Sequence, residues 1–120
     1  MDPHGQYLVV KVDSEAGRYL VRYGLSDRSE QRLSISDRYR ISGYPLGPDA
    51  IGPDGRIAIQ VSPLDSWFWP AAILDPRTGE MELATQIEAD MISPGWDNEG
   101  RLVTSALFFR SSLWRFHLDK

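Results

Sequence analysis

Short apolar runs alternate with polar, turn-forming segments along most of the chain. The runs are rich in Val, Ile, Tyr, Phe and Trp, and they occupy residues 7–12, 18–25, 56–61, 67–74, 101–109 and 112–118. Within residues 56–61, the side chains of Ile57, Ile59 and Val61 stand at every second position, which is the period of a β-strand. No window of helical length carries a clear apolar stripe at i, i+3, i+4 and i+7 with a cap at each end. The pattern therefore predicts a nearly all-β chain.

One segment between two apolar runs has the composition of a tight hairpin turn. It reads Asp75-Pro76-Arg77-Thr78-Gly79. Pro suits the second position of a type I turn, and Gly accepts the positive φ of the bulge that follows. We interpret this acidic turn as a plain hairpin rather than as a cation site. Residues 80–92 contain many helix formers, and we interpret their first half as a strand.

Three marks recur along the chain in the same order. Gly5, Gly55 and Gly100 each precede a strand-like run, with spacings of 50 and 45 residues. Upstream of two of these glycines, residues 49–53 (Asp-Ala-Ile-Gly-Pro) resemble residues 90–94 (Asp-Met-Ile-Ser-Pro), 41 residues later. The third mark is a leucine close to an aspartate: Leu25 with Asp27, Leu74 with Asp75, and Leu118 with Asp119. A period of roughly 40–50 residues in an all-β chain predicts the four-stranded antiparallel blades of a β-propeller.

The amino-acid sequences of the turns resemble those of a known kind of repeat. Residues 52–59 (GPDGRIAI), 71–83 (AAILDPRTGEMEL) and 93–103 (SPGWDNEGRLV) resemble the repeats of TolB-type and WD40-like propellers. The resemblance implies an Asp-Gly turn between the first and second strands of a blade, and an Asp-x-x-Thr-Gly-Glu turn between the third and fourth. The third copy departs from the pattern by having Asn98-Glu99 before its glycine, and the first has His4 there. Such motifs specify a fold and leave function open.

Counting strands on this pattern gives an incomplete propeller segment. The expected blades cover residues 1–44, 45–86 and 87–120, with three, four and three strands. Two or three blades cannot close a ring. We therefore expect either a part of a longer propeller or a subunit that closes with a copy of itself. Twenty strands in a dimer would make five blades, so a homodimer or larger ring is predicted. A small β-sandwich whose repeats only mimic blades is the third interpretation.

The amino-acid composition and net charge argue against several classes of binding partner and chemistry. Hydrophobic residues make up 42% of the chain and charged residues 25%, as in ordinary globular domains. The net charge of −4 argues against nucleic acid as a partner. No run of about 18 apolar residues occurs, so membrane insertion is not expected. Cysteine is absent from the sequence, which excludes disulfides, thiol nucleophiles and cysteine-ligated zinc.

Candidate chemistry is sparse. His4 and His117 are isolated, and neither a G-x-S-x-G elbow nor a Walker or dinucleotide glycine pattern occurs. We therefore predict no catalytic residue and no cofactor. Asp97, Asn98 and Glu99 form the best polar cluster and are a weak candidate for calcium. A bulged hairpin turn explains these three residues more simply.

Aromatic residues gather in Trp67, Phe68 and Trp69. For this group, together with Trp96, Trp114 and Phe116, we expect packing between blades. At least one of Trp67 and Trp69 should still be accessible as a contact for a ligand or partner.

The sequence thus predicts a non-catalytic binding or scaffold module with a protein partner or with itself as partner. The alternative is a fragment of a propeller enzyme, either a calcium-dependent lactonase-like hydrolase or the gating domain of a peptidase.

Overall fold

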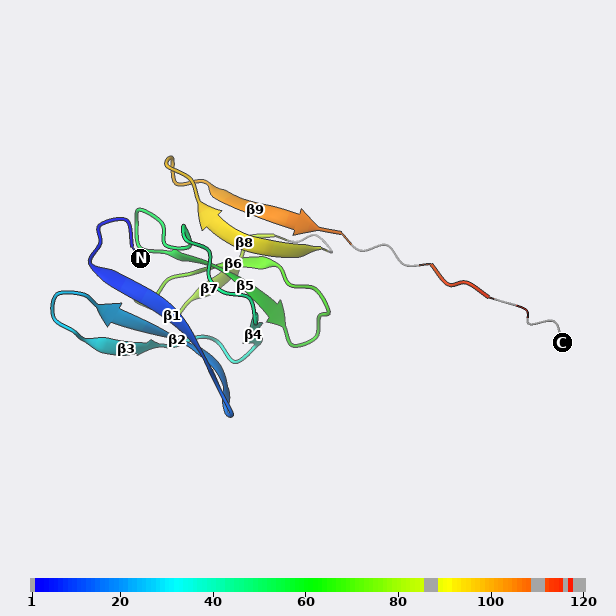
Figure 1. Cartoon of the computed structure of the whole chain (residues 1–120), viewed down its shortest axis with the longest axis horizontal. Coiled ribbons are helices and arrows are strands. Elements are labelled where there is room, and N and C mark those ends of the chain that lie inside the picture. Colours follow the sequence, from blue (N-terminus) through cyan, green and yellow to red (C-terminus); the bar gives the residue numbers. More distant parts are fainter. Residues whose placement is uncertain (1, 86–88, 109–111, 116, 118–120) are drawn as a thin grey trace.

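The regular structure of this protein is β throughout. The computed structural model describes residues 2–85, 89–108, 112–115 and 117, and in these residues there are strands and no helix (Figure 1). The strands are β1 (Tyr7–Ser14), β2 (Gly17–Gly24), β3 (Glu30–Leu33), β4 (Tyr39–Ile41), β5 (Ile57–Pro63), β6 (Ala71–Leu74), β7 (Met81–Leu83), β8 (Asp90–Trp96) and β9 (Leu102–Leu107). The prediction of an all-β fold is confirmed.

The strands form three antiparallel sheets, each a meander of chain neighbours. Their orders are β1-β2-β3, β4-β5-β6-β7 and β8-β9. The first, middle and third sheets thus hold three, four and two of the described strands, where three, four and three were expected. In the described part of the last expected strand, at residues 112–118, no strand forms: residues 112–115 and 117 are exposed and extend away from the sheets (Figure 1). Residues 116 and 118 lie outside the described residues.

The glycine turn recurs three times with the same geometry. The backbone φ angles of Gly5, Gly55 and Gly100 are 67°, 84° and 75°. The amide of each glycine donates to the carbonyl oxygen three residues earlier, at 3.0, 3.0 and 3.1 Å. Positive φ favours glycine because a Cβ atom would be strained there. The prediction that Gly55 and Gly100 occupy positive φ is confirmed.

The unequal spacing of these turns has a single structural cause. Arg40 pairs with Ser62, and Asp90 pairs with Leu107 at the same place in the next sheet. Arg40 follows Gly5 by 35 residues, just as Asp90 follows Gly55 by 35 residues. The difference therefore lies later in the first strand of each sheet. There, residues 43–49 loop out of the middle sheet, whereas the third sheet has only a two-residue bulge at 93–94.

Strand pairing corrects the other two marks of the repeat. Because Asp90 is equivalent to Arg40, the alignment of residues 49–53 with 90–94 is wrong. Tyr7 pairs with Gly24, and Ile57, 50 residues after Tyr7, pairs with Leu74. Gly24 is therefore the equivalent of Leu74, so the alignment of Leu25 with Leu74 is also wrong. Leu25 is accordingly exposed, whereas Leu74 is buried. Residues 118 and 119 lie outside the described residues.

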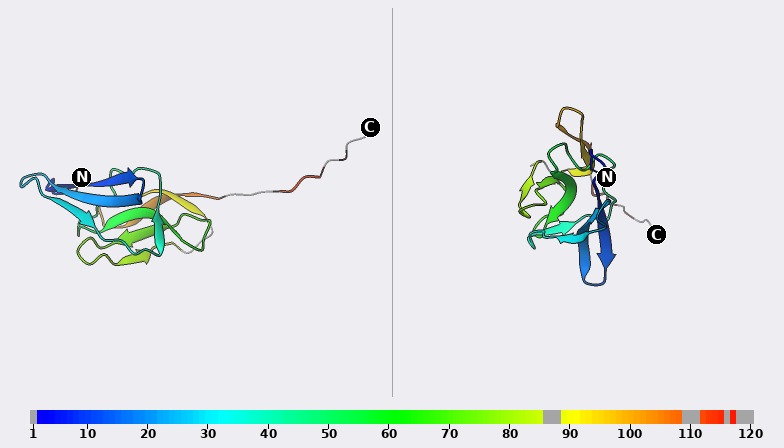
Figure 2. Two further views of the ribbon diagram at one scale, coloured as in Figure 1. Left: turned by 90° about the horizontal axis from the view of Figure 1, so that it is seen from below. Right: turned by 90° about the vertical axis from the view of Figure 1, so that its left-hand side faces the viewer.

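The middle sheet is covered on both faces. Ile57, Ile59 and Val61 of β5 form one apolar cluster with residues of the first sheet, among them Tyr7 and Leu20. On the opposite face, a second cluster joins the middle sheet to the third, and its members are Ala71, Ala89, Met91 and Leu102. Every residue of β5 before Pro63 is therefore buried. The left view of Figure 2 shows the first sheet (blue) above the middle sheet (green).

The two junctions between sheets use different pairs of faces. Tyr7 and Val9 stand 50 residues before Ile57 and Ile59, and both pairs belong to the same cluster. The first and middle sheets therefore turn equivalent faces toward each other, as in a sandwich. At the other junction, Met91, the equivalent of Ile41, packs on the face of the middle sheet that points away from Ile41. Uniform stacking of repeats would use one pair of faces throughout, so the propeller arrangement stays a prediction.

Candidate binding cleft between the first and middle sheets

A cleft of about 900 Å³ separates the end of the first hairpin from the edge of the middle sheet. One wall is formed by residues 13–18, at the end of the β1–β2 hairpin. The other wall consists of residues 35–37 between β3 and β4, the whole of β4, and Trp69. The volume lies in the range of clefts that hold ligands. Of the two sequence-predicted contact residues, the structure brings Trp69 to this cleft.

Trp67 lies on the loop beside the cleft, where the repeat is broken. In the first sheet the hairpin ladder continues to Ser14 and Gly17 and closes with a two-residue turn. In the middle sheet the β5–β6 register ends at Gln60 and Ala71, with one further hydrogen bond from the Val61 amide to Pro70 O, and residues 64–69 leave the ladder. Trp67, which stands 50 residues after Gly17, is 94% exposed. The expected accessibility is confirmed, while the strand expected over residues 67–74 is found only at 71–74.

Polar contacts hold this loop and fix Trp69 as a wall of the cleft. The Trp69 amide donates to Asp90 Oδ1 at 2.9 Å. Arg40 Nη2 donates to Ser62 Oγ at 3.2 Å and to Ser66 O at 3.0 Å. The Arg40 guanidinium also lies 5.6 Å from the centroid of the Trp69 ring, within the range of a cation–π contact. Trp69 is half-buried as a result.

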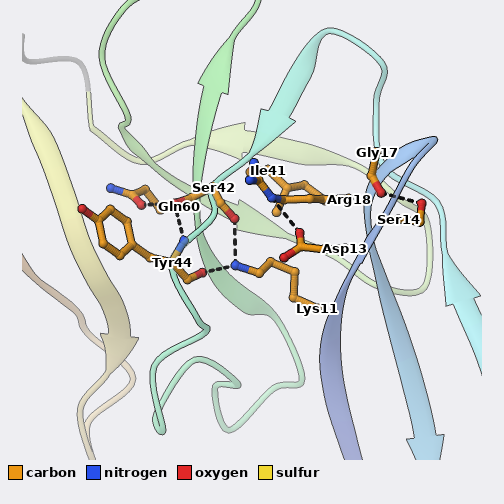
Figure 3. Close-up of polar contacts among 9 residues, drawn as sticks. All are labelled: Lys11, Asp13, Ser14, Gly17, Arg18, Ile41, Ser42, Tyr44 and Gln60. Carbon is orange, nitrogen blue, oxygen red and sulfur yellow. Dashed lines mark hydrogen bonds and ion pairs between the residues drawn. The ribbon is translucent and has the colours of Figure 1, made fainter.

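Two cationic side chains of the first sheet cap backbone carbonyls at the edge of the middle sheet (Figure 3). Lys11 Nζ donates to Ser42 O at 2.9 Å and also to Tyr44 O. Arg18 Nη1 donates to Ile41 O at 3.2 Å, while its Nε donates to Asp13 Oδ1 at 2.7 Å. Desolvation by burial lowers the pKa of Lys11, and the negative charge of Asp13 opposes this effect. The two cationic side chains thus donate to backbone carbonyl oxygens that a neighbouring strand would otherwise satisfy.

Buried polar groups support the loop that Lys11 holds. The Ser42 hydroxyl donates to Gln60 Oε1, and both side chains are buried. The Tyr44 amide donates to Ser42 Oγ at 3.1 Å (Figure 3). Sequence reasoning missed this arrangement. Its signals were the five extra residues between the first two glycine turns, and Lys11, which interrupts an apolar face of β1.

The acidic cluster at residues 97–99 forms hydrogen bonds and ion pairs within the third glycine turn. Asp97 Oδ1 accepts the Glu99 amide at 2.9 Å and the Arg101 amide at 2.8 Å, and Asp97 Oδ2 accepts Arg101 Nε at 2.7 Å. The Arg101 backbone and guanidinium donors lower the pKa of Asp97. Arg101 Nη2 also lies 3.4 Å from Glu99 Oε2, and Asn98 is exposed. Across the described part of the chain, no three His, Asp or Glu residues gather as a metal-binding group.

The remaining aromatic residues divide between packing and exposure. Trp96 packs between the middle and third sheets, as expected: its Nε1 donates to Ala50 O at 3.1 Å. A Cβ on Gly52 would lie 3.2 Å from the Trp96 ring, so a larger residue there would require the ring to shift. Trp114 is 76% exposed, so the expectation of a packed position is wrong for it. Phe116 lies outside the described residues.

Both histidines, His4 and His117, are exposed and stand apart in the sequence. The described residues include no helix that is long and apolar enough to cross a membrane. Comparison with protein-family models, with curated proteins and with solved structures finds no match.

Proposed function

We propose that this chain is a non-catalytic protein-binding module whose contact surface is the loop of Trp67 and Trp69 with the adjoining cleft. The observation that carries the proposal is the break in the repeat at this loop. The first sheet closes its hairpin with two residues, whereas the middle sheet places a 94% exposed tryptophan at the equivalent point. Tryptophan is the residue type most enriched at binding hot spots, and its exposure in the unbound protein leaves apolar area for a partner to cover.

No specific observation favours either enzymatic alternative, the calcium-dependent hydrolase or the gating domain of a peptidase. Both oxygens of the Asp97 carboxylate accept N–H donors of its own turn. The cleft lining holds Ser14 and Ser36 but no histidine that would act as their base.

Selection from a displayed library of random peptides tests the binding function. We expect peptides that bind the wild-type chain and lose at least tenfold in affinity to Trp67→Ala and Trp69→Ala. Trp114→Ala is the matched control, because it removes an exposed tryptophan outside the cleft. A selection that yields no binders, or binders equally sensitive to Trp114→Ala, would contradict the proposal.

We further propose that the sheets belong to a propeller-type array that is completed by a second copy or by further chain. The proposal is supported by the open edges of β1 and β9, each paired on one side among the described strands. Val103 and Leu107 of β9 are 57% and 42% exposed. Open edges and uncovered apolar faces recruit other strands and sheets.

Sedimentation across a wide concentration range tests this proposal. It should reveal a dimer or larger species, and Val103→Lys should weaken this association. A monomer with sharp, cooperative unfolding would contradict self-completion.

A further inference from the structure

The cleft beside Trp69 follows the open edge of β4. The Leu64 amide donates to Arg38 O at 3.1 Å, and the Ser42 amide donates to Gln60 O at 3.2 Å. In an antiparallel ladder the bonded residues alternate, so the backbone groups of Tyr39 and Ile41 point away from β5. The outward Tyr39 amide donates to Ser36 O, and the outward Ile41 carbonyl accepts Arg18. The Tyr39 carbonyl and the Ile41 amide remain directed along this edge, where an extended peptide backbone could bind them.

Of the charged side chains that line the cleft, the arginines have partners within the protein, whereas two of the carboxylates have none in the described part of the chain. Arg18 forms an ion pair with Asp13, and Arg40 is held by Ser66 and the Trp69 ring. Glu15 stands on the hairpin wall and Asp37 on the opposite wall, and both are exposed. Among the described residues, neither carboxylate takes part in a hydrogen bond or ion pair of its side chain. The guanidinium groups are thus engaged within the protein, and two carboxylates face the solvent of the cleft.

From this arrangement we infer that the cleft binds an extended, basic segment of a partner protein, with lysine or arginine side chains near Glu15 and Asp37 and its backbone along β4. The inference rests on the proposed binding function and names the chemistry of the partner. The Tyr39 and Trp69 rings line the same cleft, so a cationic side chain would meet aromatic surface as well as opposite charge.

Binding of three synthetic nonapeptides by fluorescence anisotropy tests this inference. The peptides alternate valine with lysine, with glutamine or with glutamate, and all carry blocked termini. We expect the lysine peptide to bind about tenfold more tightly than the glutamine peptide at low salt, and the preference to shrink as salt screens the charges. The glutamate peptide should bind most weakly. Spermine carries positive charge without a peptide backbone and should bind at least tenfold more weakly than the lysine peptide.

Matched variants locate the effect. The double variant Glu15→Gln with Asp37→Asn should remove most of the preference for the lysine peptide. The control Glu82→Gln removes an exposed carboxylate from β7, outside the cleft lining, and should leave the preference intact. Equal binding of the glutamate peptide, equal binding of spermine, or an equal effect of Glu82→Gln would overturn the inference. If Trp67-dependent binders emerge from the library but the lysine peptide shows no preference, this inference fails while the binding function stands.

Discussion

β5 and β9 occupy the same place in successive sheets but differ in their surroundings. Ala58 of β5 is 1% exposed, while its equivalent in β9, Val103, is 57% exposed. The larger and more apolar side chain thus lies on the outside. The first sheet covers one face of β5 and the third sheet covers the other, whereas the outer face of β9 has no described neighbour. Burial in this chain is therefore decided by neighbouring sheets rather than by the strand itself.

The largest expected effect exploits this contrast with one chemical change at two sites. Val61→Ala, in the fully buried part of β5, should lower the free energy of unfolding by about 2–3 kcal/mol, because it removes two packed methyl groups and leaves a cavity. At protein concentrations low enough to keep the chain monomeric, Val103→Ala should cost less than about 0.5 kcal/mol, because water contacts that side chain in the single chain. Urea unfolding of both variants measures the difference. Equal losses would mean that β9 is covered in solution and would support association.

The glycine turns offer a second test, in which the covered and uncovered sheets should respond alike. Gly55→Val and Gly100→Val should each destabilise the chain by roughly 1–3 kcal/mol, because valine is strained at φ 84° and 75°. A Cβ at Gly100 would meet no atom within 4 Å, so strain alone acts there. Gly100→Asn is the control, since Asn tolerates positive φ better than valine. Unchanged urea midpoints for both valine variants would contradict the shared turn geometry.

A smaller effect is expected from the acid dependence of the third turn. Hydrogen bonds from Arg101 hold the pKa of Asp97 below its usual value. The stability that this carboxylate contributes is therefore present above about pH 4, the usual aspartate pKa, and is lost as the pH falls through the lower pKa of the folded state. The gap in urea midpoint between wild type and Asp97→Asn should be wider at pH 7 than at pH 3. Asp65→Asn, at an exposed carboxylate in another loop, serves as the control. A gap that is constant with pH would contradict this role.

The smallest expected effect is that of calcium. Because the Asp97 oxygens already accept three N–H donors, millimolar calcium should leave the melting temperature of the chain within about 1 °C of its value in chelator. Differential scanning fluorimetry measures this directly. A rise of several degrees that disappears in Asp97→Ala would instead favour the hydrolase interpretation and would set the third turn apart from the other two.

The parts of the fold that depend only on residues adjacent in the sequence could be predicted. The positive φ at Gly55 follows from local turn chemistry, and the strand at residues 57–63 follows from its alternating apolar side chains. The choice of faces at the first junction could not be predicted, because both faces of β1 carry valines.

The candidate site was predicted only in part for the same reason. An aromatic cluster beside polar loop residues is visible in the sequence, and the accessibility of at least one of Trp67 and Trp69 followed from it. The cleft itself depends on contacts such as Arg18 with Ile41, which span 23 residues. Trp114 was misplaced because the expected strand at residues 112–118 rested on composition alone, and a strand also needs a partner edge.

The positions of the four tryptophans make the two junctions separately visible to optical spectroscopy. Trp69 lies beside the cleft between the first and middle sheets, and Trp96 lies between the middle and third sheets. Trp67 and Trp114 are exposed, so dissolved quenchers reach them freely. With both exposed residues replaced by phenylalanine, and one of the other two replaced in turn, the remaining emission would follow a single junction. Melting curves recorded this way would tell whether the sandwich-like junction and the other junction separate together or one after the other.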